Sequence, residues 1–377
     1  MIETITLGLL TIFTLYYIYF FTRIHRGLLS LHAAPSIITI QPIVTVIIAA
    51  RDEEQSIDQC LQSLLRQTYP QKKFEILVVD DGSTDSTASI VKKYSELIPH
   101  IHLLTLPHGV DRKSGCKPLA ITNGIAQAIG EIILTTDADC LVPPRWIEIM
   151  VNHFEEDVAF VAGPIAEQPS FNFFSQMEQL EFLGLITTAA GLIGSGRPII
   201  CNGANLAYRK EAFFSAGGFG NDGSSNDDES LMNRIAYRNI GRIVFAPESD
   251  AVIITQSSNT IISFLRQRIR WANKRGRYEN KSILVTLMAL YLFFLSFASA
   301  VLLIPFNTRL LLPVLLVFVI KVMIDYFILC SGARLFLQRI QVFHFLIAEL
   351  LHVPYIVFAS AIGQLSSLQW KGRIITR

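Results

Sequence analysis

Two carboxylates stand two positions apart where an apolar segment ends. Residues 132–136 read Ile-Ile-Leu-Thr-Thr and lead into Asp137 and Asp139. In an extended chain alternate side chains project to the same side, so both carboxylates can approach one hard cation. Such a cation bridges a diphosphate and neutralises charge on a departing nucleoside diphosphate. The pair predicts a divalent-metal site, although acids at strand ends also serve as simple caps.

A second acidic cluster, Asp-Asp-Gly-Ser-Thr-Asp, occupies residues 80–85 at the end of another apolar segment. Gly82 allows a turn whose backbone can approach a ligand closely. A carboxylate beside it, such as that of Asp81, can accept hydrogen bonds from a base N–H or a ribose hydroxyl. The alternative is a strand-to-helix turn whose Ser or Asp caps the next helix, and the two interpretations are compatible.

Two adjacent acids, Asp227 and Asp228, follow the glycine-rich residues 217–225, a composition typical of a mobile loop. One interpretation is that Asp228 is a general base that takes a proton from an acceptor hydroxyl. The other is that both acids complement the dipole of a helix that starts there. Considered alone, this segment favours the second interpretation.

A basic stretch from residue 267 to Lys281 opens with Gln-Arg-Ile-Arg-Trp. It is either a juxtamembrane patch that faces anionic lipid headgroups or a diphosphate-binding segment, because guanidinium groups pair bidentately with phosphate oxygens. In the second case Trp271 supplies a flat apolar wall for a sugar ring.

Predicted strands and helices alternate between residues 43 and 140, and both acidic clusters lie at strand ends. Apolar β-branched runs predict strands buried on both faces of a parallel sheet. This alternation is typical of a doubly wound α/β sheet, whose ligands bind at the carboxyl ends of the strands. The predicted strands are 44–50, 74–80, 101–106 and 131–140, and the predicted helices are 54–68, 84–94 and 117–129.

The composition predicts membrane segments. Hydrophobic residues make up 51% of the chain and charged residues only 17%, and the mean hydropathy is +0.42. Most charges lie between Arg23 and Lys281, which indicates a polar domain joined to apolar segments. Four apolar runs approach or exceed the roughly 20 residues that a spanning helix needs. They cover residues 5–21, 283–304, 310–330 and 342–362.

Positive charges predict the orientation of these runs. Arg23 and Arg26 follow the first run and Glu3 precedes it, which favours an uncleaved anchor with the N-terminus outside and the polar domain in the cytosol. Three further spans would leave the basic tail, residues 370–377, outside. Either one of those runs is interfacial or the tail is an exception to the rule.

Residues 171–193 are also apolar but contain Glu178 and Glu181. We predict an amphipathic helix at the membrane surface, with a buried core helix as the alternative.

Cysteine content and net charge narrow the class further. The five cysteines contain no C-x-x-C pair, which argues against a disulfide framework or a zinc site and for reduced thiols. A net charge of +1 gives no reason to expect nucleic-acid binding.

The order of these segments resembles the membrane-bound family 2 glycosyltransferases. These enzymes have a GT-A fold and include cellulose, hyaluronan and poly-N-acetylglucosamine synthases and lipid glycosyltransferases. The resemblance runs in register from Val44 to Trp271, and the flanking apolar segments match the layout of the family. It is carried by VIIAARDEE, VVDDGSTD, CKPLA, TTDADC, CNGANLAY, GGF, NDDESL and QRIRW.

The resemblance implies roles for individual residues on the donor side. It places Asp81 against the base, Lys117 near the phosphates and Arg270 over the diphosphate. Asp137 and Asp139 become the sugar-nucleotide and metal acids, with Asp139 the stronger metal ligand. The nucleotide pocket would also include Ala49, Arg51 and Glu53.

On the acceptor side the resemblance implies that Asp228 is the catalytic base, within the acid pair that it forms with Asp227. The motif that closes over the diphosphate and lines the acceptor site would contribute Gln267 and Trp271. The other residues expected near the acceptor are Asn202, Gly203 and Asn205.

The chain departs from the family pattern at four positions. Ala49 stands where Pro is common, and Asp52 where Asn is common. Cys116 replaces the Gly that usually precedes the lysine, which bears on the assignment of Lys117. Asp227 replaces a Glu, which shortens the first acid of the pair and leaves the base position intact.

We therefore expect an inverting glycosyltransferase that transfers a sugar from a nucleotide sugar, with UDP as the nucleotide and Mg²⁺ or Mn²⁺ as the cofactor, to a membrane-associated lipid or glycan acceptor. The expected protein is integral to the plasma (inner) membrane with a cytosolic catalytic domain. Its expected parts are a transmembrane anchor at 1–24, an α/β GT-A domain at 40–281 and a C-terminal transmembrane region at 282–377.

Two alternatives accompany this expectation. A processive polysaccharide synthase belongs to the same class, but four candidate membrane segments are few for a polymer-conducting channel, which favours single or limited addition. A non-catalytic nucleotide-binding membrane protein belongs to another class, and the intact acids at every catalytic position argue against it.

Overall fold

The computed structural model divides into two compact units that alternate along the chain. The helical unit comprises Met1–Ser30, Pro169–Ser195 and Ser257–Ser366, and the sheet unit comprises Leu31–Gln168, Gly196–Gln256 and Ser367–Arg377. The two are interleaved, whereas the sequence interpretation used continuous ranges. The structure describes residues 2–34, 41–106, 116–169, 172–219, 227–257, 260–272, 278–365, 368–370 and 373–375.

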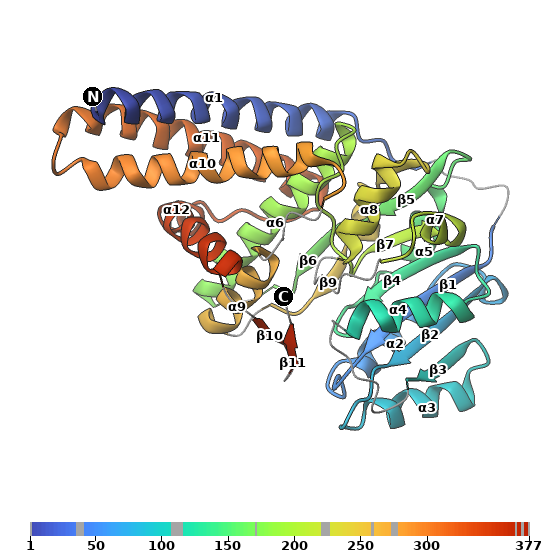
Figure 1. Cartoon of the computed structure of the whole chain (residues 1–377). Helices are drawn as coiled ribbons and strands as arrows, with labels where there is room; N and C mark the ends of the chain where they lie inside the picture. The colour runs from blue at the N-terminus through green and yellow to red at the C-terminus, as the bar shows by residue number, and fades with distance from the viewer. Residues whose placement is uncertain are drawn as a thin grey trace. The chain divides into compact units, whose positions relative to one another are not determined.

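A seven-stranded sheet is the framework of the sheet unit (Figure 1). Its order is β3-β2-β1-β4-β7-β5-β8; β7 is antiparallel to β4 and β5, and all other neighbours are parallel. This confirms the predicted α/β class with a mostly parallel sheet. The strands are β1 (Val44–Ala50), β2 (Phe74–Asp80), β3 (Ile101–Thr105), β4 (Ile132–Asp137), β5 (Val158–Ala162), β7 (Leu206–Arg209) and β8 (Arg242–Phe245).

Burial explains why the apolar runs form strands. Every residue of β2 is buried, and β1 is buried except at Ala49, as expected for strands covered on both faces. Helices connect them in the order that the sequence predicts, and further helices follow β4. These helices are α2 (Ile57–Leu64), α3 (Thr87–Leu97), α4 (Cys116–Gln127), α5 (Trp146–Asn152), α7 (Lys210–Ser215) and α8 (Asp227–Tyr237).

Smaller elements complete the sheet unit. Strands β6 (Ile165–Glu167) and β9 (Ile253–Thr255) form a parallel pair. Strands β10 (Leu368–Trp370) and β11 (Arg373–Ile375) form an antiparallel pair in the basic tail. Two short 3₁₀ helices lie at Gln71–Lys73 and Ser249–Ala251.

The helical unit contains α1 (Ile2–Leu29), α6 (Phe173–Gly194), α9 (Ile261–Ala272), α10 (Lys281–Leu303), α11 (Leu311–Leu335) and α12 (Val342–Leu365), with a 3₁₀ turn at Thr308–Leu310. Within the described residues, four helical segments are long and apolar enough to cross a membrane. They are Ile2–Leu29, Lys281–Leu303, Thr308–Leu335 and Val342–Gly363, and they coincide to within one residue with or contain the four predicted apolar runs.

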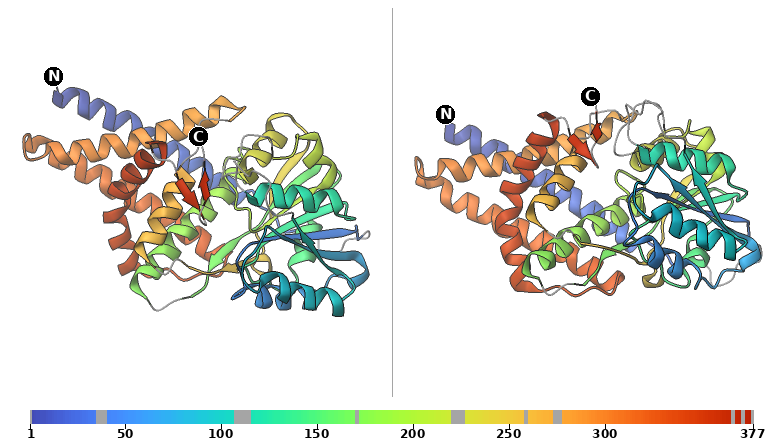
Figure 2. Two further views of the ribbon diagram at one scale, coloured as in Figure 1. Left: turned by 60° about the horizontal axis from the view of Figure 1, so that its bottom comes forward. Right: turned by 90° about the horizontal axis from the view of Figure 1, so that it is seen from below.

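Apolar packing holds these helices together. Tyr17 of α1 stacks on Phe293 of α10 with ring centroids 4.2 Å apart, and Phe297 and Val317 extend the same core onto α11. Helices α1, α10 and α11 run side by side, and α12 runs across them (Figures 1 and 2). Exposed side chains such as Leu312 are apolar as well, as a lipid environment requires.

Helix α6 is buried among these helices. Twelve of its 22 residues are buried, including the consecutive residues 189–193. Five successive residues point in all directions around a helix, so this end has no solvent-facing side. A Cβ on Gly191 would lie 2.6 Å from the Ile24 carbonyl oxygen, which shows how closely α6 approaches α1. The observed burial favours the core-helix alternative over an amphipathic surface helix.

Candidate active site

The carboxyl edge of the sheet brings three predicted segments together. In the register of β1 with β2, Ala50 pairs with Asp80, and in that of β1 with β4, Ala49 pairs with Asp137. The Asp81 N–H donates to the Ala50 carbonyl at 2.9 Å, which extends the β1–β2 pairing by one residue. The acids that end β2 and β4 therefore lie at one edge, on either side of the β1 end.

The loop after β1 is tied to the turn after β2. Asp52 has a φ of 52°, in the left-handed region that Asp and Asn tolerate best among residues with a Cβ. Its Oδ1 accepts from the Thr84 N–H at 2.7 Å, and its own N–H donates to Ser83 Oγ at 3.0 Å. The backbone hydrogen bond from Thr84 lowers the pKa of Asp52. Asp therefore serves here in place of the more common Asn.

Two acids of the 80–85 segment accept hydrogen bonds from residues that are close to them in the sequence. Asp80 Oδ1 accepts from the Ser83 N–H at 3.2 Å and from Ser83 Oγ at 2.5 Å. Asp85 Oδ1 accepts from the Thr87 N–H at 2.9 Å and from Thr87 Oγ1 at 2.6 Å, at the start of α3. The capping alternative therefore holds for Asp85, and a turn role holds for Asp80.

Asp81, in contrast, is buried next to an arginine from the loop after β1. Its carboxylate is 4% exposed, and Arg51 Nη1 lies 3.9 Å from Asp81 Oδ2. The two residues assigned to the nucleotide pocket are thus close to each other. Their contact with a base or ribose stays a prediction.

Lys117, in the first turn of α4, contacts the acid that ends β4: its Nζ donates to Asp137 Oδ1. Burial lowers the pKa of the Lys117 amine, but the nearby carboxylates of Asp137 and Asp228 raise it further, so the net shift is upward. The amine is therefore protonated at neutral pH. A Cys at position 116 in place of Gly does not prevent this placement.

Asp139 lies in an excess of negative charge. Burial, followed by the charges of Asp137 and Glu53, raises the pKa of Asp139 to about 6. A carboxyl group whose ionisation is opposed by its neighbours is a group that a cation would stabilise. The carboxylate oxygens at this position therefore suit a hard divalent cation.

The donor set fits Mg²⁺ or Mn²⁺ held jointly with a substrate. The two carboxylates of Asp137 and Asp139 cannot complete the coordination of such an ion by themselves. Mg²⁺ is, however, commonly bound by one or two carboxylates together with substrate phosphates. The nearby thiols of Cys60 and Cys140 are buried, and burial raises the pKa of both. They are protonated, as expected for structural cysteines.

Asp228, on the first turn of α8, points at a segment that precedes β7. A Cβ on Gly203 would lie 1.9 Å from Asp228 Oδ2, so only glycine fits there. Asp228 Oδ1 is buried and has no hydrogen-bond partner within the described part of the chain. Burial raises the pKa of Asp228; Lys117 opposes this shift, and Asp137 and Glu229 add to it. The result is a half-buried Asp228 whose buried Oδ1 has unused acceptor capacity and whose carboxylate interacts electrostatically with a lysine.

Asn205 holds the segment that carries Gly203. It is 0% exposed, and its Nδ2 donates to the Pro164 carbonyl at 2.7 Å and the Ala251 carbonyl at 2.9 Å. Its Oδ1 accepts from Trp146 Nε1 at 2.8 Å. We therefore expect Asn205 to position the acceptor-side segment rather than to touch an acceptor.

The same segment is fixed at two further points. Asn202 Oδ1 accepts from the Ala204 N–H at 3.1 Å, and Thr135 Oγ1 donates to the Gly203 carbonyl at 3.1 Å. These bonds tie Gly203 to β4, the strand that ends in Asp137.

The sequence interpretation did not single out Tyr208. Its hydroxyl is buried and has no hydrogen-bond partner among the described residues, and its ring stacks on Phe160 at 5.8 Å. Burial, followed by the negative charge of Asp228, raises the pKa of Tyr208. A Tyr two residues after an apolar Leu in a strand is predicted to be an ordinary core residue. The sequence therefore contains no signal that distinguishes Tyr208 from a core aromatic residue such as Phe160.

The Gln-Arg-Ile-Arg-Trp segment forms part of α9 in the helical unit. Gln267 and Trp271 are half-buried there. The side chains of Asp227 and Arg270 lie outside the described part of the structure. The predicted convergence of this segment on the acids stays a prediction.

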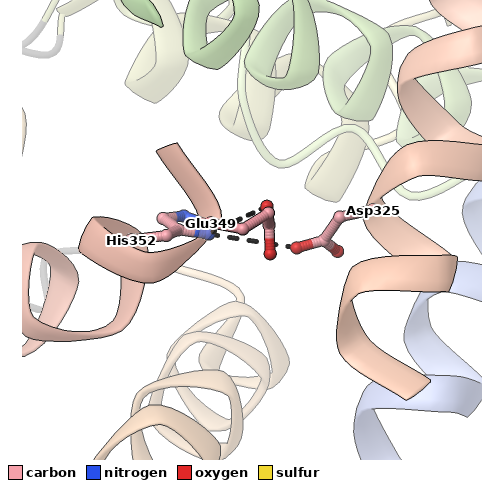
Figure 3. A group of neighbouring side chains, drawn as sticks. All are labelled: Asp325, Glu349 and His352. Atoms are coloured by element: carbon pink, nitrogen blue, oxygen red, sulfur yellow. Dashed lines mark ion pairs between the residues drawn. The ribbon is translucent and has the colours of Figure 1, made fainter. Parts of the chain in front are cut away.

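A different acid cluster has metal-like spacing, and it lies in the helical unit. Oxygen and nitrogen atoms of Asp325, Glu349 and His352 lie within 4.8 Å of one another (Figure 3). Lys321 Nζ already contacts all three, at 2.8, 2.5 and 3.1 Å respectively. Its ammonium group takes the place that a metal ion would need.

The mostly parallel sheet with paired acids at its carboxyl edge defines a GT-A-type fold. The chain belongs to the glycosyltransferases of family group 2. The family described as "Glycosyl transferase family group 2" matches residues 132–364, and "Glycosyl transferase family 2" matches residues 45–214.

Known relatives differ in what they make. The beta-monoglucosyldiacylglycerol synthase of Synechocystis sp. is 28% identical over 247 residues, 63% of this chain and 48% of that protein. The poly-beta-1,6-N-acetyl-D-glucosamine synthase of Staphylococcus aureus is 24% identical over 241 residues, 63% of this chain and 55% of that protein. The chain thus spans about half the length of these curated relatives.

Among solved structures, the chain is similar to the mannosyltransferase PcManGT from Pyrobaculum calidifontis in complex with GDP-Man and Mn²⁺. The two are 22% identical, the TM-score is 0.64, and the match covers 97% of this chain and 99% of that one. This likeness shows a shared fold.

Proposed function

We propose that this protein is an inverting glycosyltransferase that transfers a sugar from a nucleotide sugar to a membrane-associated lipid or glycan acceptor. The observation that supports it most directly is Asp228, a half-buried residue whose buried Oδ1 has no hydrogen-bond partner among the described residues. It lies against Gly203 and close enough to Lys117 and Asp137 to interact electrostatically. Family membership supplies the reaction class, and this arrangement supplies a general base for it.

The donor would bind at the carboxyl edge of the sheet. Asp81 and Arg51 would hold the nucleoside, with Ala49 and Glu53 completing the pocket. Lys117, protonated and in contact with Asp137, would lie near the phosphates. A divalent ion held by Asp137 and Asp139 would neutralise charge on the departing diphosphate.

The protein's own groups would then carry the proton transfer. Asp228 would take the proton of the acceptor hydroxyl, and the hydroxyl oxygen would attack the anomeric carbon from the face opposite the leaving group. The bond to the nucleoside diphosphate would break as the new glycosidic bond forms, which inverts the configuration. Lys117 would counter charge on the leaving group by electrostatics arranged in advance.

The acceptor would be a membrane-associated lipid or glycan. Gly203 lets the Asp228 carboxylate lie directly against the backbone, because any larger residue would collide with it. Asn202, Gln267 and Trp271 would line the acceptor site, and Arg270 would close over the diphosphate. Four candidate spanning helices in the described residues support an integral membrane location, and Arg23 and Arg26 after the first span favour a cytosolic catalytic domain. We place the protein in the plasma (inner) membrane.

Single or limited addition is the preferred mode. Relatives include both a lipid glucosyltransferase and a polysaccharide synthase, so the class alone does not decide. The four candidate membrane helices found in the described residues are few for a polymer-conducting channel, which favours single or limited addition. The length of the product on a gel separates the two modes.

A donor panel tests the proposal. Full-length protein in detergent is incubated with UDP- and GDP-linked sugars, Mg²⁺ or Mn²⁺ and a lipid extract, and nucleoside diphosphate release is measured. We expect release with one donor class, UDP sugars first, that depends on the metal and yields a glycosylated lipid by mass analysis. A protein that binds nucleotide but neither hydrolyses nor transfers any donor would support the non-catalytic alternative instead.

A further inference from the structure

Arg268, the first arginine of the Gln-Arg-Ile-Arg-Trp segment, is almost completely buried inside the helical unit. Its side chain is 3% exposed. Arg266, two residues earlier on the same helix, is exposed. A buried guanidinium must be paired and hydrogen-bonded, because its desolvation is otherwise prohibitive. The contacts of Arg268 therefore indicate what it does.

The partner of Arg268 is Glu181 on α6. Arg268 Nε lies 3.1 Å from Glu181 Oε1 and 2.9 Å from Oε2, and Nη2 also contacts Oε2. Two donors of one guanidinium thus engage one carboxylate, which is the strongest and most directional form of this ion pair. Tyr355 of α12 donates to Glu181 Oε1 at 3.4 Å. The pair therefore joins α9 to α6, with α12 alongside.

The same guanidinium contacts the two residues assigned to the acceptor side. Its Nη1 donates to Gln267 Oε1 at 2.6 Å. Its Cζ lies 4.3 Å from the centroid of the Trp271 ring and 4.6 Å from that of Phe264. One face of the Trp271 ring is thus covered by Arg268, so a sugar has access only to the rest of the ring.

Helix α12 limits how far α9 can move. A Cβ on Gly363 would lie 2.9 Å from the Ile269 carbonyl oxygen, so the backbones of the two helices approach closely there. The Glu181 pair and the close approach to Gly363 both restrict the position of α9. The orientation of Gln267 and Trp271 depends on that position.

We propose that Arg268 is a positioning residue: held by Glu181, it orients the Gln267 amide and the Trp271 ring and does not bind the leaving diphosphate. This inference rests on the proposed function, since it takes Gln267 and Trp271 to serve the acceptor side. The two arginines of the segment then have separate tasks. Arg270 is the diphosphate-binding candidate, and Arg268 holds the helix.

A charge exchange tests the pair. Glu181→Arg and Arg268→Glu are made singly and together in the full-length protein, with Arg266→Glu as the matched control on the same helix. We expect each single change to lower kcat/KM by about 10²-fold and the double variant to recover to within about tenfold of the wild type. The control stays within about twofold. A double variant as inactive as Arg268→Glu overturns the inference.

Arg268→Lys separates positioning from diphosphate binding and from mere folding. Lysine keeps the charge but lacks the planar fork. We expect UDP or GDP affinity with Mn²⁺ within about threefold of the wild type, a raised acceptor KM, and a kcat per nucleotide-binding site about tenfold lower. Weakened nucleotide binding with an unchanged acceptor KM would make Arg268 a diphosphate ligand. A wild-type kcat per site with only a lower melting temperature would leave it a purely structural residue.

Different results would refute the proposed function and the role of Arg268. A wild-type protein that is inactive across the whole donor panel refutes the proposed function, and the inference falls with it. An active wild type whose Arg268 variants behave as a diphosphate ligand or as a purely structural residue refutes the inference alone.

Discussion

Two lysine–carboxylate clusters, one in each unit, use the same residue types in opposite ways. The Lys117 cluster comprises Lys117, Asp137, Asp139 and Asp228. The Lys321 cluster comprises Tyr17, Lys321, Asp325, Glu349 and His352. The first has three carboxylates and one ammonium group, and the second has two carboxylates and one ammonium group. We infer that this difference in charge balance suits the first cluster to a reaction and the second to a structural role.

In the Lys321 cluster the carboxylates have partners. Lys321 is 0% exposed and contacts both Asp325 and Glu349, and the Tyr17 hydroxyl donates to Asp325. These groups lie near the middle of helices long enough to span a membrane, where an unpaired charge is costly. The network therefore joins α1, α11 and α12.

In the Lys117 cluster acceptor capacity remains unused. Lys117 contacts Asp137, but Asp228 Oδ1 has no hydrogen-bond partner among the described residues, and Asp139 is left among like charges. A site that leaves charge uncompensated can gain a cation, a proton or a substrate hydroxyl. In the Lys321 cluster each carboxylate already contacts the ammonium group, so we expect that cluster to contribute stability.

The largest expected effect is on Asp228. We predict that Asp228→Asn, which keeps the shape but removes the base, lowers transfer by about 10²-fold or more while donor binding is retained. Steady-state kinetics and nucleotide titration measure the two quantities. Near-wild-type turnover would remove Asp228 from the mechanism and make the two clusters alike.

The opposite cluster should affect stability. We predict that Lys321→Met destabilises the fold by about 3–5 kcal/mol, because it leaves two buried carboxylates without their cation. Thermal unfolding in detergent measures the effect. The variant Lys321→Met with Asp325→Asn and Glu349→Gln should recover part of the loss. We also expect Zn²⁺ to stabilise Lys321→Met and not the wild type, since the substitution frees the three-ligand set. An unchanged melting temperature in Lys321→Met would show that the network contributes nothing.

Metal affinity at the other cluster should depend on pH. The pKa of Asp139 is raised to about 6, so below that pH a proton occupies the carboxylate that the metal requires. We predict that Mn²⁺ affinity falls by up to about tenfold per pH unit as the pH drops below 6 and is nearly constant above 7. Titration of Mn²⁺ with UDP present between pH 5 and 8 measures this. A flat profile would exclude Asp139 as a ligand.

The smallest effect is expected at a surface pair. Lys92 and Glu96 lie 4.0 Å apart with side chains 70% and 64% exposed. We predict that Lys92→Met changes stability by no more than about 0.5 kcal/mol, because water and salt screen exposed pairs. A change comparable to that of Lys321→Met would show that burial does not govern these ion pairs.

Much of the sheet unit could be predicted from local sequence. The apolar runs at 44–50 and 74–80 coincide with β1 and β2, because a strand buried on both faces must be apolar throughout. In a parallel sheet the acids after such strands necessarily lie at one edge. The positions of Asp81 and Asp137 near the end of β1 follow from that rule.

Contacts between segments distant in the chain needed the tertiary structure. Gly203 lies against the Asp228 carboxylate, and Lys321 donates to Glu349 on another helix. The Asn205 side-chain oxygen accepts a hydrogen bond from Trp146. Nothing in the local pattern specifies these pairs, because helix packing and strand order decide which side chains meet. The sequence alone predicted the strands and helices between residues 43 and 140, the apolar spans, the family resemblance and the acids that end the strands. The tertiary structure decided which charges are compensated, since compensation depends on distances between elements.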